Sequence, residues 1–345
     1  KVILDELIGI NPQLNKIITK NNTYFYDFLI LATGSEVSYF GHEQWESFAP
    51  GLKSIEDATF LRGKILQAFE KAERIKNQKA TEKIMKFVII GGGPTGVEIA
   101  GAIAELSKKV LSKEFVNIDP KAAQIILLEA GENILPTASY NLSVYAKNSL
   151  EKLGIKVHCN TVVQNISENS VETNKETINA ETIIWCAGVK ASPLKSWLNV
   201  KTDQAGRVLV NEDLSISPYS NIFVIGDASH VKDKNDKPLP GLAPVAKQEG
   251  SFVAEVIKRN ILKNKTKNKF YYKNRGYLAT IGRSEAIVDF EWFTLKGKIG
   301  WIFWSIIHIY FLIGFRNRLM VFINWIWSYL TFGKGARLIT KNKNE

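Results

Sequence analysis

The amino-acid sequence predicts an α/β protein built on doubly wound, mostly parallel sheets, with a helical region at its C-terminus. Three observations lead to this prediction. An apolar strand, a G-x-G-x-x-G turn and a helix start follow one another without a break over residues 86–98. The next apolar strand ends in Glu129, and a later one ends in Gly226 and Asp227. Glycines and carboxylates directly after buried strands mark the carboxyl edge of such sheets, where these folds bind ligands.

The segment before residue 86 is predicted to contain strands over residues 1–34, beginning with a strand from Lys1 to Ile10 and closing on the run from Phe28 to Gly34. A helix from Glu56 to Ile75 and a polar linker from Asn77 to Lys83 follow. The chain begins with Lys1, without a methionine or a signal-peptide pattern, so we expect it to be N-terminally incomplete.

The glycines of the turn have separate physical tasks. Gly91 permits the tight bend from strand to helix, Gly93 lets a pyrophosphate approach the backbone, and Gly96 lets helix and strand pack closely. The N–H groups of the helix start then face the anion. The turn is therefore predicted to bind a dinucleotide through Gly91, Gly92, Gly93, Pro94, Thr95 and Gly96.

A lone glycine motif is weak support, but its surroundings fit the same unit. A strand is predicted over 87–90, a helix over 96–106 and a second strand over 125–128. A glycine-rich turn without a ligand would not explain the acidic residue that follows. Glu129 can accept a hydrogen bond from a ribose 2′-OH and would repel a 2′-phosphate, which favours NADH over NADPH.

Glu129 follows Gly91 by 38 residues, whereas the compact motif needs about 20. We therefore expect an insertion over 108–123, with a turn at Asp119-Pro120. The remaining elements expected in this region are a helix over 143–153 ended by Gly154, a strand over 156–159, a hairpin over 165–179 and a strand over 182–187.

A further strand from Asn221 to Gly226 places Asp227 at a sheet edge. A carboxylate there can bind a ligand, or it can cap a helix, and the sequence leaves both open. A helix is predicted to start within the segment from Leu242 to Gly250 and to end at Leu262.

The C-terminal tail has two apolar runs, over 299–315 and 319–332, which Arg316, Asn317 and Arg318 separate. Residues 297–345 hold seven Lys/Arg against one acidic residue, more than half of the net charge of +11, and four of the eight Trp. Aromatic residues and cations around apolar segments are typical of a membrane interface. Both runs are short for a span, so we prefer interfacial helices to a transmembrane hairpin, core helices or a dimer face.

Two cysteines, Cys159 and Cys186, lack the spacing of a redox dithiol or a zinc site, so we expect structural thiols and no metal. The length suggests about two domains. A pI near 9.4 alone would also permit nucleic-acid binding, but the positive charge clusters with apolar helices, so we expect no nucleic-acid partner.

These features together resemble the type II NADH:quinone oxidoreductases, single-subunit respiratory dehydrogenases that do not pump protons. The resemblance covers nearly the whole chain. The segments that carry it are 26–35, 52–58, 86–98, 127–130, 184–189, 225–228, 243–250 and 314–319. Several of them occur in all two-dinucleotide flavoproteins, whereas the segments around Gln248 and Gly314 are more specific to this family.

The resemblance implies a glutathione-reductase-like flavoprotein fold that binds FAD and NADH. Thr33 and Gly34 would lie along FAD, and Asp227, after Gly226, would bond the flavin ribitol. Ala187 and Gly188 would lie beside the nicotinamide half of NADH. The site residues implied for FAD and NADH are Thr33, Gly34, Gly91, Gly92, Gly93, Pro94, Thr95, Gly96, Glu98, Glu129, Ala187, Gly188, Gly226, Asp227 and Ala246.

Two residues are implied to be catalytic. Glu98 matches a glutamate near the nicotinamide and flavin that is discussed as a proton or charge partner; the alternative is a solvated first-turn carboxylate favoured by the helix dipole. Gln248 can donate to and accept from a quinone oxygen, and with Ala246 it matches the quinone headgroup segment. We expect Lys247 and Glu249 to be exposed residues of the helix start.

The chain departs from the family in one respect: it contains only the second of two glycine fingerprints. The first FAD βαβ unit, which holds the FAD pyrophosphate in the family, is therefore expected to be missing before Lys1. The predicted segments are a remnant of the FAD domain (1–53), the NADH domain (54–205), the rest of the FAD domain with the quinone segment (206–296) and membrane-anchoring helices (297–345).

The implied reaction is hydride transfer from NADH to FAD, then delivery of electrons and protons to menaquinone or ubiquinone. We expect a peripheral membrane protein that binds the anionic lipid surface on the cytoplasmic face of the bacterial inner membrane. A homodimer is a further expectation. The alternatives are a soluble ferredoxin- or disulfide-reductase-type flavoprotein, a sulfide:quinone reductase, which needs reactive cysteines, and a non-enzymatic redox-responsive flavoprotein.

Overall fold

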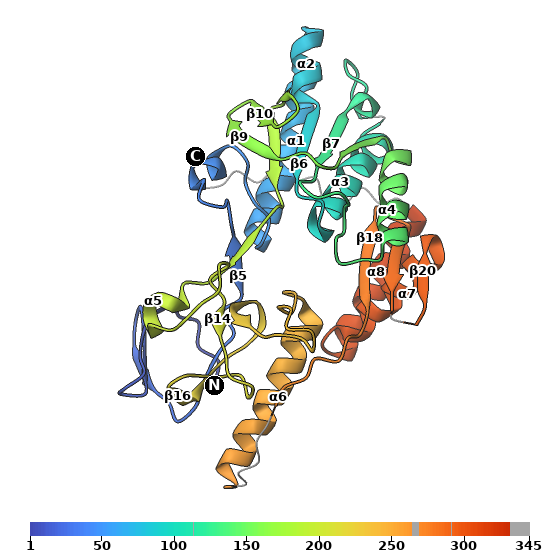
Figure 1. Cartoon of the computed structure of the whole chain (residues 1–345). Coiled ribbons are helices and arrows are strands. Elements are labelled where there is room, and N and C mark those ends of the chain that lie inside the picture. Colours follow the sequence, from blue (N-terminus) through green and yellow to red (C-terminus); the bar gives the residue numbers. More distant parts are fainter. Residues whose placement is uncertain (113, 264–268, 291, 332–345) are drawn as a thin grey trace. The chain divides into compact units, whose positions relative to one another are not determined.

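The computed structural model describes residues 1–112, 114–263, 269–290 and 292–331, and for 328–331 the backbone alone (Figure 1). The chain forms two compact units. The first unit contains residues 1–36 and 189–275, and the second contains 37–188 and the chain from 276 onward. Each unit is thus assembled from separate segments, as in nested nucleotide-binding folds. The predicted assignment of segments to cofactors, with boundaries at 53, 205 and 296, stays a prediction.

The second unit is built on a four-stranded parallel sheet with the strand order β12-β6-β7-β8. Its strands are β6 (Lys86–Ile90), β7 (Gln124–Leu128), β8 (Ile155–His158) and β12 (Thr182–Trp185). All four apolar runs were predicted as strands, and the structure confirms this. The chain moves from β6 to β7 and β8 on one side, whereas β12 lies on the other side of β6. The strand order therefore reverses at β6, where doubly wound sheets form their binding crevice.

Both faces of this sheet are covered, as the continuous apolar strands require. Phe87 and Ile89 belong to one core with α1 (Ile55–Arg74), α3 (Pro94–Glu105) and α4 (Tyr140–Lys152). Val88 and Ile90 belong to the other core. That core is closed by an antiparallel meander of β9 (Val163–Ser167), β10 (Ser170–Thr173) and β11 (Thr177–Asn179) and by residues near the 3₁₀ helix Glu43–Ser47.

The predicted polar linker over 77–83 is wrong. It forms helix α2 (Gln78–Ile84), because the Asn77 side chain accepts a hydrogen bond from Ala80 N and the Ile84 side chain is buried. Helix α3 begins two residues before the prediction, since Pro94 fits the first helical position. The predicted insertion over 108–123 is mostly irregular; a π-helical turn (Leu106–Val110) precedes it and a 3₁₀ turn (Pro120–Ala122) lies near its end.

The first unit contains the antiparallel strands β1 (Leu7–Asn11), β2 (Lys16–Thr19) and β3 (Thr23–Phe25). A second sheet has the order β15-β16-β4 and contains β4 (Leu29–Leu31), β15 (Ser215–Ile216) and β16 (Tyr219–Val224). The prediction of a strand from Lys1 is wrong for the first six residues, because β1 starts only at Leu7, opposite Thr19 of β2.

Helix α6 (Ala243–Ile261) covers one face of the β15-β16-β4 sheet, where Val253 packs in one core with Phe223. The other face packs on α5 (Leu194–Leu198). There are also two short two-stranded sheets. One pairs β5 (Ser35–Val37) with β13 (Val189–Ala191), and the other pairs β14 (Val208–Leu209) with β17 (Ser229–His230). The helix predicted to end at Leu262 is confirmed to within one residue.

The C-terminal part of the second unit begins with the antiparallel strands β18 (Tyr277–Ile281), β19 (Glu285–Asp289) and β20 (Thr294–Lys296). They contact α3 and α4 and are followed by α7 (Gly297–Phe311) and α8 (Phe315–Thr331). A Cβ on Gly101 of α3 would lie 2.8 Å from Gly282 N, so the close approach of α3 to the β18–β19 turn depends on glycine.

The two predicted tail helices are confirmed, but the predicted break at Arg316–Arg318 is wrong. The helices part at Leu312–Gly314, where Gly314 has φ +81°, and Arg318 lies in the first turn of α8. Its Nε donates to Leu312 O at 2.9 Å, so the arginine provides a hydrogen-bond partner for the carbonyl at the C-terminal end of α7. Over the described ranges, no helix is both long and apolar enough to cross a bilayer. Position 332 of the predicted second run lies outside them.

Candidate active site

The glycine turn lies at the carboxyl edge of the parallel sheet, next to the residues predicted to share its ligand. Gly91 N donates to Leu128 O at 2.8 Å, and Cys186 N donates to Ile90 O at 2.7 Å. The ends of β12, β6 and β7 therefore stay in register as the strands finish. This brings Gly91, Glu129 and Ala187 to one edge of one sheet, at the point where the strand order reverses.

The turn fits the pyrophosphate of a dinucleotide. Gly91 has φ +109°, and a Cβ there would lie 2.6 Å from the Cys186 backbone. A Cβ on Gly96 would lie 1.9 Å from Gly91 O, so the helix can approach the strand only with glycine at this position. A Cβ on Gly93, by contrast, would meet nothing within 4 Å. Gly93 is also the N-cap of α3, so open space lies in front of a helix N-terminus, which attracts anions.

Glu129 is held against the same turn. Its Oε2 accepts from Gly92 N at 2.6 Å, and its Oε1 accepts from Gly131 N at 2.7 Å. Two backbone donors thus fix the carboxylate just beyond β7. A fixed anion beside the phosphate-binding turn would repel the 2′-phosphate of NADPH, and its oxygens can accept from a ribose hydroxyl.

Ala187 and Gly188 follow β12 in a crowded stretch of the second unit. The Ala187 Cα lies 2.7 Å from the position of a Cβ on Gly91, and a Cβ on Gly188 would lie 2.5 Å from the Phe40 ring. Gly188 O accepts from Ser38 N at 3.0 Å. The backbone here is therefore packed too closely for larger side chains at positions 91 and 188.

Glu98 lies on α3 and reaches the C-terminal strands of the same unit. Thr280 Oγ1 of β18 donates to Glu98 Oε1 at 3.1 Å. The residue is exposed at the surface, yet the protein around it desolvates the carboxyl and raises its pKa, against the lowering effect of the Thr280 hydrogen bonds. The first turn of α3 contains no acidic residue, so the alternative of a first-turn carboxylate stabilised by the helix dipole is wrong.

A second carboxyl edge lies in the first unit. Strands β4 and β16 are parallel, with Leu31 opposite Val224, so the segments that follow them emerge at the same edge. Thr33 and Gly34 follow β4, and Gly226 and Asp227 follow β16. Gly34 and Gly226 both have φ +70°. The four residues assigned to FAD by resemblance therefore lie together.

Side chains hold this edge in place. Ser35 Oγ donates to Asp227 Oδ2 at 2.7 Å, and a Cβ on Gly241 would lie 3.1 Å from Asp227 Oδ1. The Thr33 and Ser192 hydroxyls share a short hydrogen bond. Asp227 lies inside the 3₁₀ turn Gly226–Ala228, whose N-cap residue is Ile225. A carboxylate oriented at a sheet edge fits the hydroxyls of a flavin ribitol.

Ala246 and Gln248 lie on α6. Ala246 Cβ is 3.4 Å from the position of a Cβ on Gly226, so this part of α6 contacts the edge turn. Gln248 uses both groups of its amide within the protein: Nε2 donates to Lys273 O and Oε1 accepts from Lys273 N, each at 3.0 Å. The predicted ability to donate and accept is present, but in this structure it serves the backbone of Lys273.

Glu249 is the residue that the sequence interpretation missed. It was expected to be exposed, and that is wrong: it is 1% exposed. Its carboxylate accepts from Gly226 N at 2.5 Å and from Ser229 Oγ at 3.2 Å. Burial and, to a smaller degree, the charge of Asp227 raise its pKa to about 7, although the hydrogen bonds lower it. The spacing Val245, Glu249, Val253, Val256 on the buried stripe of α6 was the available signal.

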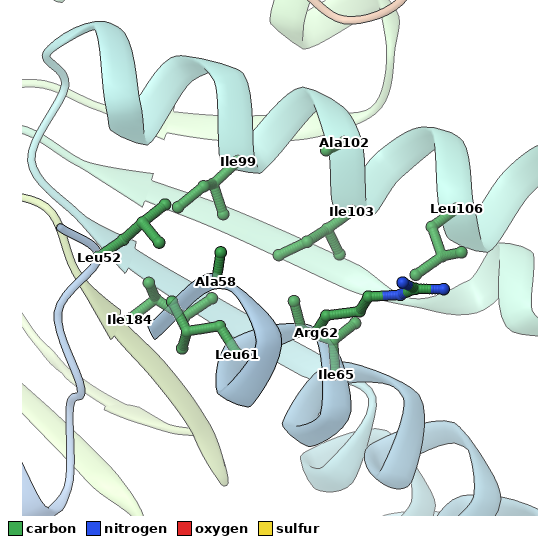
Figure 2. Close-up of a pocket in the computed structure, with 10 residues that line it drawn as sticks. All are labelled: Leu52, Ala58, Leu61, Arg62, Ile65, Ile99, Ala102, Ile103, Leu106 and Ile184. Carbon is green, nitrogen blue, oxygen red and sulfur yellow. The ribbon is translucent and has the colours of Figure 1, made fainter. Parts of the chain in front are cut away.

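An apolar cavity of about 210 Å³ lies between α1 and α3, where Leu61 and Ile65 face Ile99 and Ile103 (Figure 2). Arg62 extends along it toward Leu106 (Figure 2). None of the described residues that line it belongs to the predicted sites. The cavity is a gap between helices and not the nucleotide edge.

Comparison with known proteins agrees with this geometry. Residues 1–250 match the pyridine nucleotide-disulphide oxidoreductase family, and residues 274–334 match the NDH2 C-terminal domain. The chain is 34% identical to the type II NADH:quinone oxidoreductase NdhA of Mycobacterium tuberculosis, over 99% of this chain and 75% of that protein. It is 37% identical to the type II NADH:quinone oxidoreductase Ndh of the same organism, over 91% of this chain and 69% of that one.

Solved structures show the same fold. NDH2 of Plasmodium falciparum, solved in complex with NADH, superposes with a TM-score of 0.86 at 23% identity, covering 98% of this chain and 85% of that one. The reduced CoADR-RHD protein of Bacillus anthracis superposes less closely, with a TM-score of 0.62 at 20% identity, over 82% of this chain and 47% of that one. The family matches and the curated relatives together identify the chain as a member of the type II NADH:quinone oxidoreductase family.

Proposed function

We propose that this NADH-oxidising, quinone-reducing flavoenzyme works as a peripheral membrane protein and pumps no protons. The observation that carries the proposal is that each unit presents a carboxyl edge with the residues one cofactor needs. The glycine turn and Glu129 form one edge, and Asp227 with the turn after β4 forms the other. Family membership supports the proposal that the cofactors bound at these two edges take part in one reaction.

The second unit would bind NADH. The N-terminus of α3 and the open space at Gly93 suit the pyrophosphate, and Glu129 suits the adenosine ribose. Ala187 and Gly188 would lie beside the nicotinamide half. Glu98 would act near the nicotinamide as a proton or charge partner, and its raised pKa brings it closer to neutral pH, where a proton-exchanging group is useful.

The first unit would bind FAD, which supplies two-electron chemistry between NADH and quinone when bound. Asp227 would accept hydrogen bonds from the ribitol, while Thr33 and Gly34 would lie along the cofactor. Ala246 and Gln248 would form the headgroup site for menaquinone or ubiquinone. Because both groups of the Gln248 amide are engaged by Lys273, a quinone oxygen would have to replace one of these hydrogen bonds.

The tail would hold the protein on an anionic bilayer. Exposed apolar side chains recur along α7 at Ile299, Ile302, Ile306 and Tyr310. Those of α8 include Phe315, Leu319, Phe322, Ile323 and Trp327. Such an extent of exposed apolar surface marks an interaction site, and Arg316 beside it can meet lipid phosphates. The quinone is lipid-soluble, so docking on a bilayer would bring the enzyme to its substrate. We place it on the cytoplasmic face of the bacterial inner membrane and propose that it can form a homodimer.

The cysteines argue against a sulfide:quinone or disulfide reductase. Cys159 and Cys186 are not bonded to each other, and burial raises the pKa of the Cys186 thiol to about 12. A thiol with so high a pKa carries almost no thiolate at neutral pH, whereas sulfide and disulfide chemistry needs the thiolate.

The proposal is tested with the FAD-loaded protein, NADH and a quinone in liposomes of anionic lipid that enclose a pH-sensitive dye. We expect NADH oxidation that depends on quinone, co-sedimentation with the liposomes and no dye response beyond that of protein-free liposomes. Quinone-independent oxidation would contradict quinone reduction, failure to sediment would contradict membrane docking, and a sustained uncoupler-sensitive dye signal would contradict the absence of pumping.

A further inference from the structure

Glu249 is a buried carboxylate with a specific pair of partners. It lies on the second turn of α6 and is 1% exposed. One partner is Gly226 N, which donates to Oε2 at 2.5 Å, and the other is Ser229 Oγ, which donates to Oε2 at 3.2 Å. Burying a carboxyl group is costly unless it is hydrogen-bonded, so these contacts explain why the group can occupy the core.

These two partners lie on either side of Asp227. Gly226 precedes it, two residues after the end of β16, and Ser229 follows two residues later, at the start of β17. Gly226 O lies 2.9 Å from Ser229 Oγ and shares the single hydroxyl hydrogen with the Glu249 carboxylate, so the same group also links the two ends of the turn. Glu249 therefore holds both ends of the 3₁₀ turn Gly226–Ala228, at the centre of which Asp227 lies.

The Asp227 side chain is oriented separately. Ser35 Oγ donates to its Oδ2 at 2.7 Å, and Gly241 lies against its other oxygen. The backbone of Asp227 thus depends on Glu249, and its carboxylate depends on Ser35. Among the described charged residues, Asp227 acts on Glu249, whereas Lys247 and Glu255 of the same helix are exposed.

We propose that Glu249 is a positioning residue for the flavin: by holding both ends of the Gly226–Ser229 turn, it fixes Asp227 in the orientation that binds FAD. The inference rests on the proposed function, which places FAD at Asp227. It makes the buried carboxylate of α6 part of the cofactor site, because Glu249 supports the turn that contains Asp227.

Two substitutions separate the charge of Glu249 from its role as a hydrogen-bond acceptor. In Glu249→Gln the amide oxygen can still accept from Gly226 N and Ser229 Oγ, but it is an uncharged and weaker acceptor, so the turn loosens in part. In Glu249→Ala the buried N–H of Gly226 loses its acceptor, so the turn loses its support. We expect FAD affinity to fall about threefold in Glu249→Gln and about tenfold or more in Glu249→Ala.

The experiment measures FAD affinity by calorimetry and the flavin midpoint potential as a function of pH, in the full-length protein. Wild type should show an inflection in the potential near pH 7, where Glu249 ionises beside Asp227. Glu249→Gln should lack that inflection, and exposed Glu255→Gln should match wild type in both measurements. If Glu249 had only a structural role, Glu249→Gln would change the stability of the protein, and its flavin potential would still show the inflection near pH 7.

The failure of this inference and that of the proposed site are distinguishable. If Asp227→Asn weakens FAD binding while Glu249→Gln keeps wild-type affinity and the inflection, the inference is overturned and the FAD site stands. If wild type binds no FAD, or Asp227→Asn binds it as wild type does, the site itself fails and the inference with it. Should Glu249 variants not fold by circular dichroism, Ser229→Ala removes one of the two partners; unchanged FAD affinity in that variant overturns the inference.

Discussion

Glu129 tests the nucleotide site at the scale of one residue. Its carboxylate is fixed by Gly92 N and Gly131 N beside the phosphate turn. Glu129→Gln keeps the shape and removes the charge that repels a 2′-phosphate. We expect the ratio of kcat/KM for NADPH to that for NADH to rise about tenfold, which corresponds to about 1.4 kcal/mol.

Steady-state kinetics with both nucleotides measure this ratio. The neighbouring exposed Glu132→Gln is the matched control, since it removes the same charge outside the turn. A ratio that stays at the wild-type value in Glu129→Gln, or rises equally in both variants, would refute the assignment of Glu129 to the ribose.

Glu249 also makes stability depend on pH. Burial raises its pKa in the folded protein to about 7 from an ordinary 4.5. The folded state therefore binds the proton more tightly. This stabilisation is complete below the ordinary pKa and is lost as the pH rises to about 7, a loss of about 3 kcal/mol.

Chemical denaturation at about pH 5 and about pH 8 measures this term. Relative to Glu249→Gln, wild type should lose about 2.5 kcal/mol of unfolding free energy between these pH values. Equal changes in the two proteins would show that Glu249 does not ionise in this range in the folded state.

Gln248 raises the question of whether it binds quinone or only holds Lys273. Gln248→Ala removes both functions, whereas Lys273→Pro leaves Gln248 in place and removes the N–H that donates to Gln248 Oε1, together with the lysine side chain. For a direct contact, we expect Gln248→Ala to raise the KM for quinone about tenfold or more, by the loss of hydrogen bonding. Lys273→Pro should change it much less.

In both variants, bleaching of bound flavin by NADH should proceed at the wild-type rate, as anaerobic rapid-mixing absorbance records. If the two variants raise the KM equally, Gln248 acts through the 269–275 segment, and the direct contact is refuted. If flavin bleaching slows as much as quinone reduction does, a quinone role for Gln248 is refuted.

At the scale of elements, the strands and long helices could be predicted because their signals are local. An unbroken apolar run marks each strand of the parallel sheet, and Gly154, with φ +79°, ends α4 where the sequence placed its end. Helix α2 could not be predicted from its polar composition, since its cap at Asn77 and its one buried residue, Ile84, are weak signals. The burial of Glu249 had a local signal, its place on the apolar stripe of α6, but its partners Gly226 and Ser229 left no pattern in the sequence.

The tail helices carry the prediction for membrane docking. Ile302 and Ile306 of α7 are 53% and 63% exposed and one turn apart. Replacing both with Asp removes apolar surface from the face that would enter the lipid. We expect liposome affinity to fall by about 3 kcal/mol, roughly a hundredfold. Substitution is preferable to deletion, because α7 also packs on β19, where a Cβ on Gly300 would lie 2.6 Å from Ala286 O.

Co-sedimentation with anionic liposomes measures this affinity. The control is Ile261→Asp with Leu262→Asp, which replaces two equally exposed apolar residues at the end of α6. Docking through α7 would be contradicted if the tail variant sedimented with liposomes as wild type does, or if the control variant lost as much liposome affinity as the tail variant.

At the scale of the whole molecule, the sequence could identify the family because two family-specific segments, around Gln248 on α6 and around Gly314 in the tail, accompany the more general glycine motif. The residues that hold those edges were harder to find. Ser35 reaches Asp227 and Thr280 reaches Glu98 across 192 and 182 positions of the sequence. Such long-range pairings leave no local pattern, so a single sequence can suggest candidate ligand-binding residues but not the residues that support them.

The central claim is that one protein passes electrons from NADH to a quinone through FAD. The most direct measurement is the visible flavin absorbance of the anaerobic, FAD-loaded protein during two successive additions. The account predicts that NADH bleaches the flavin and that a quinone then restores its absorbance within the turnover time. A flavin that NADH does not bleach, or one that stays bleached with quinone in excess, would contradict it.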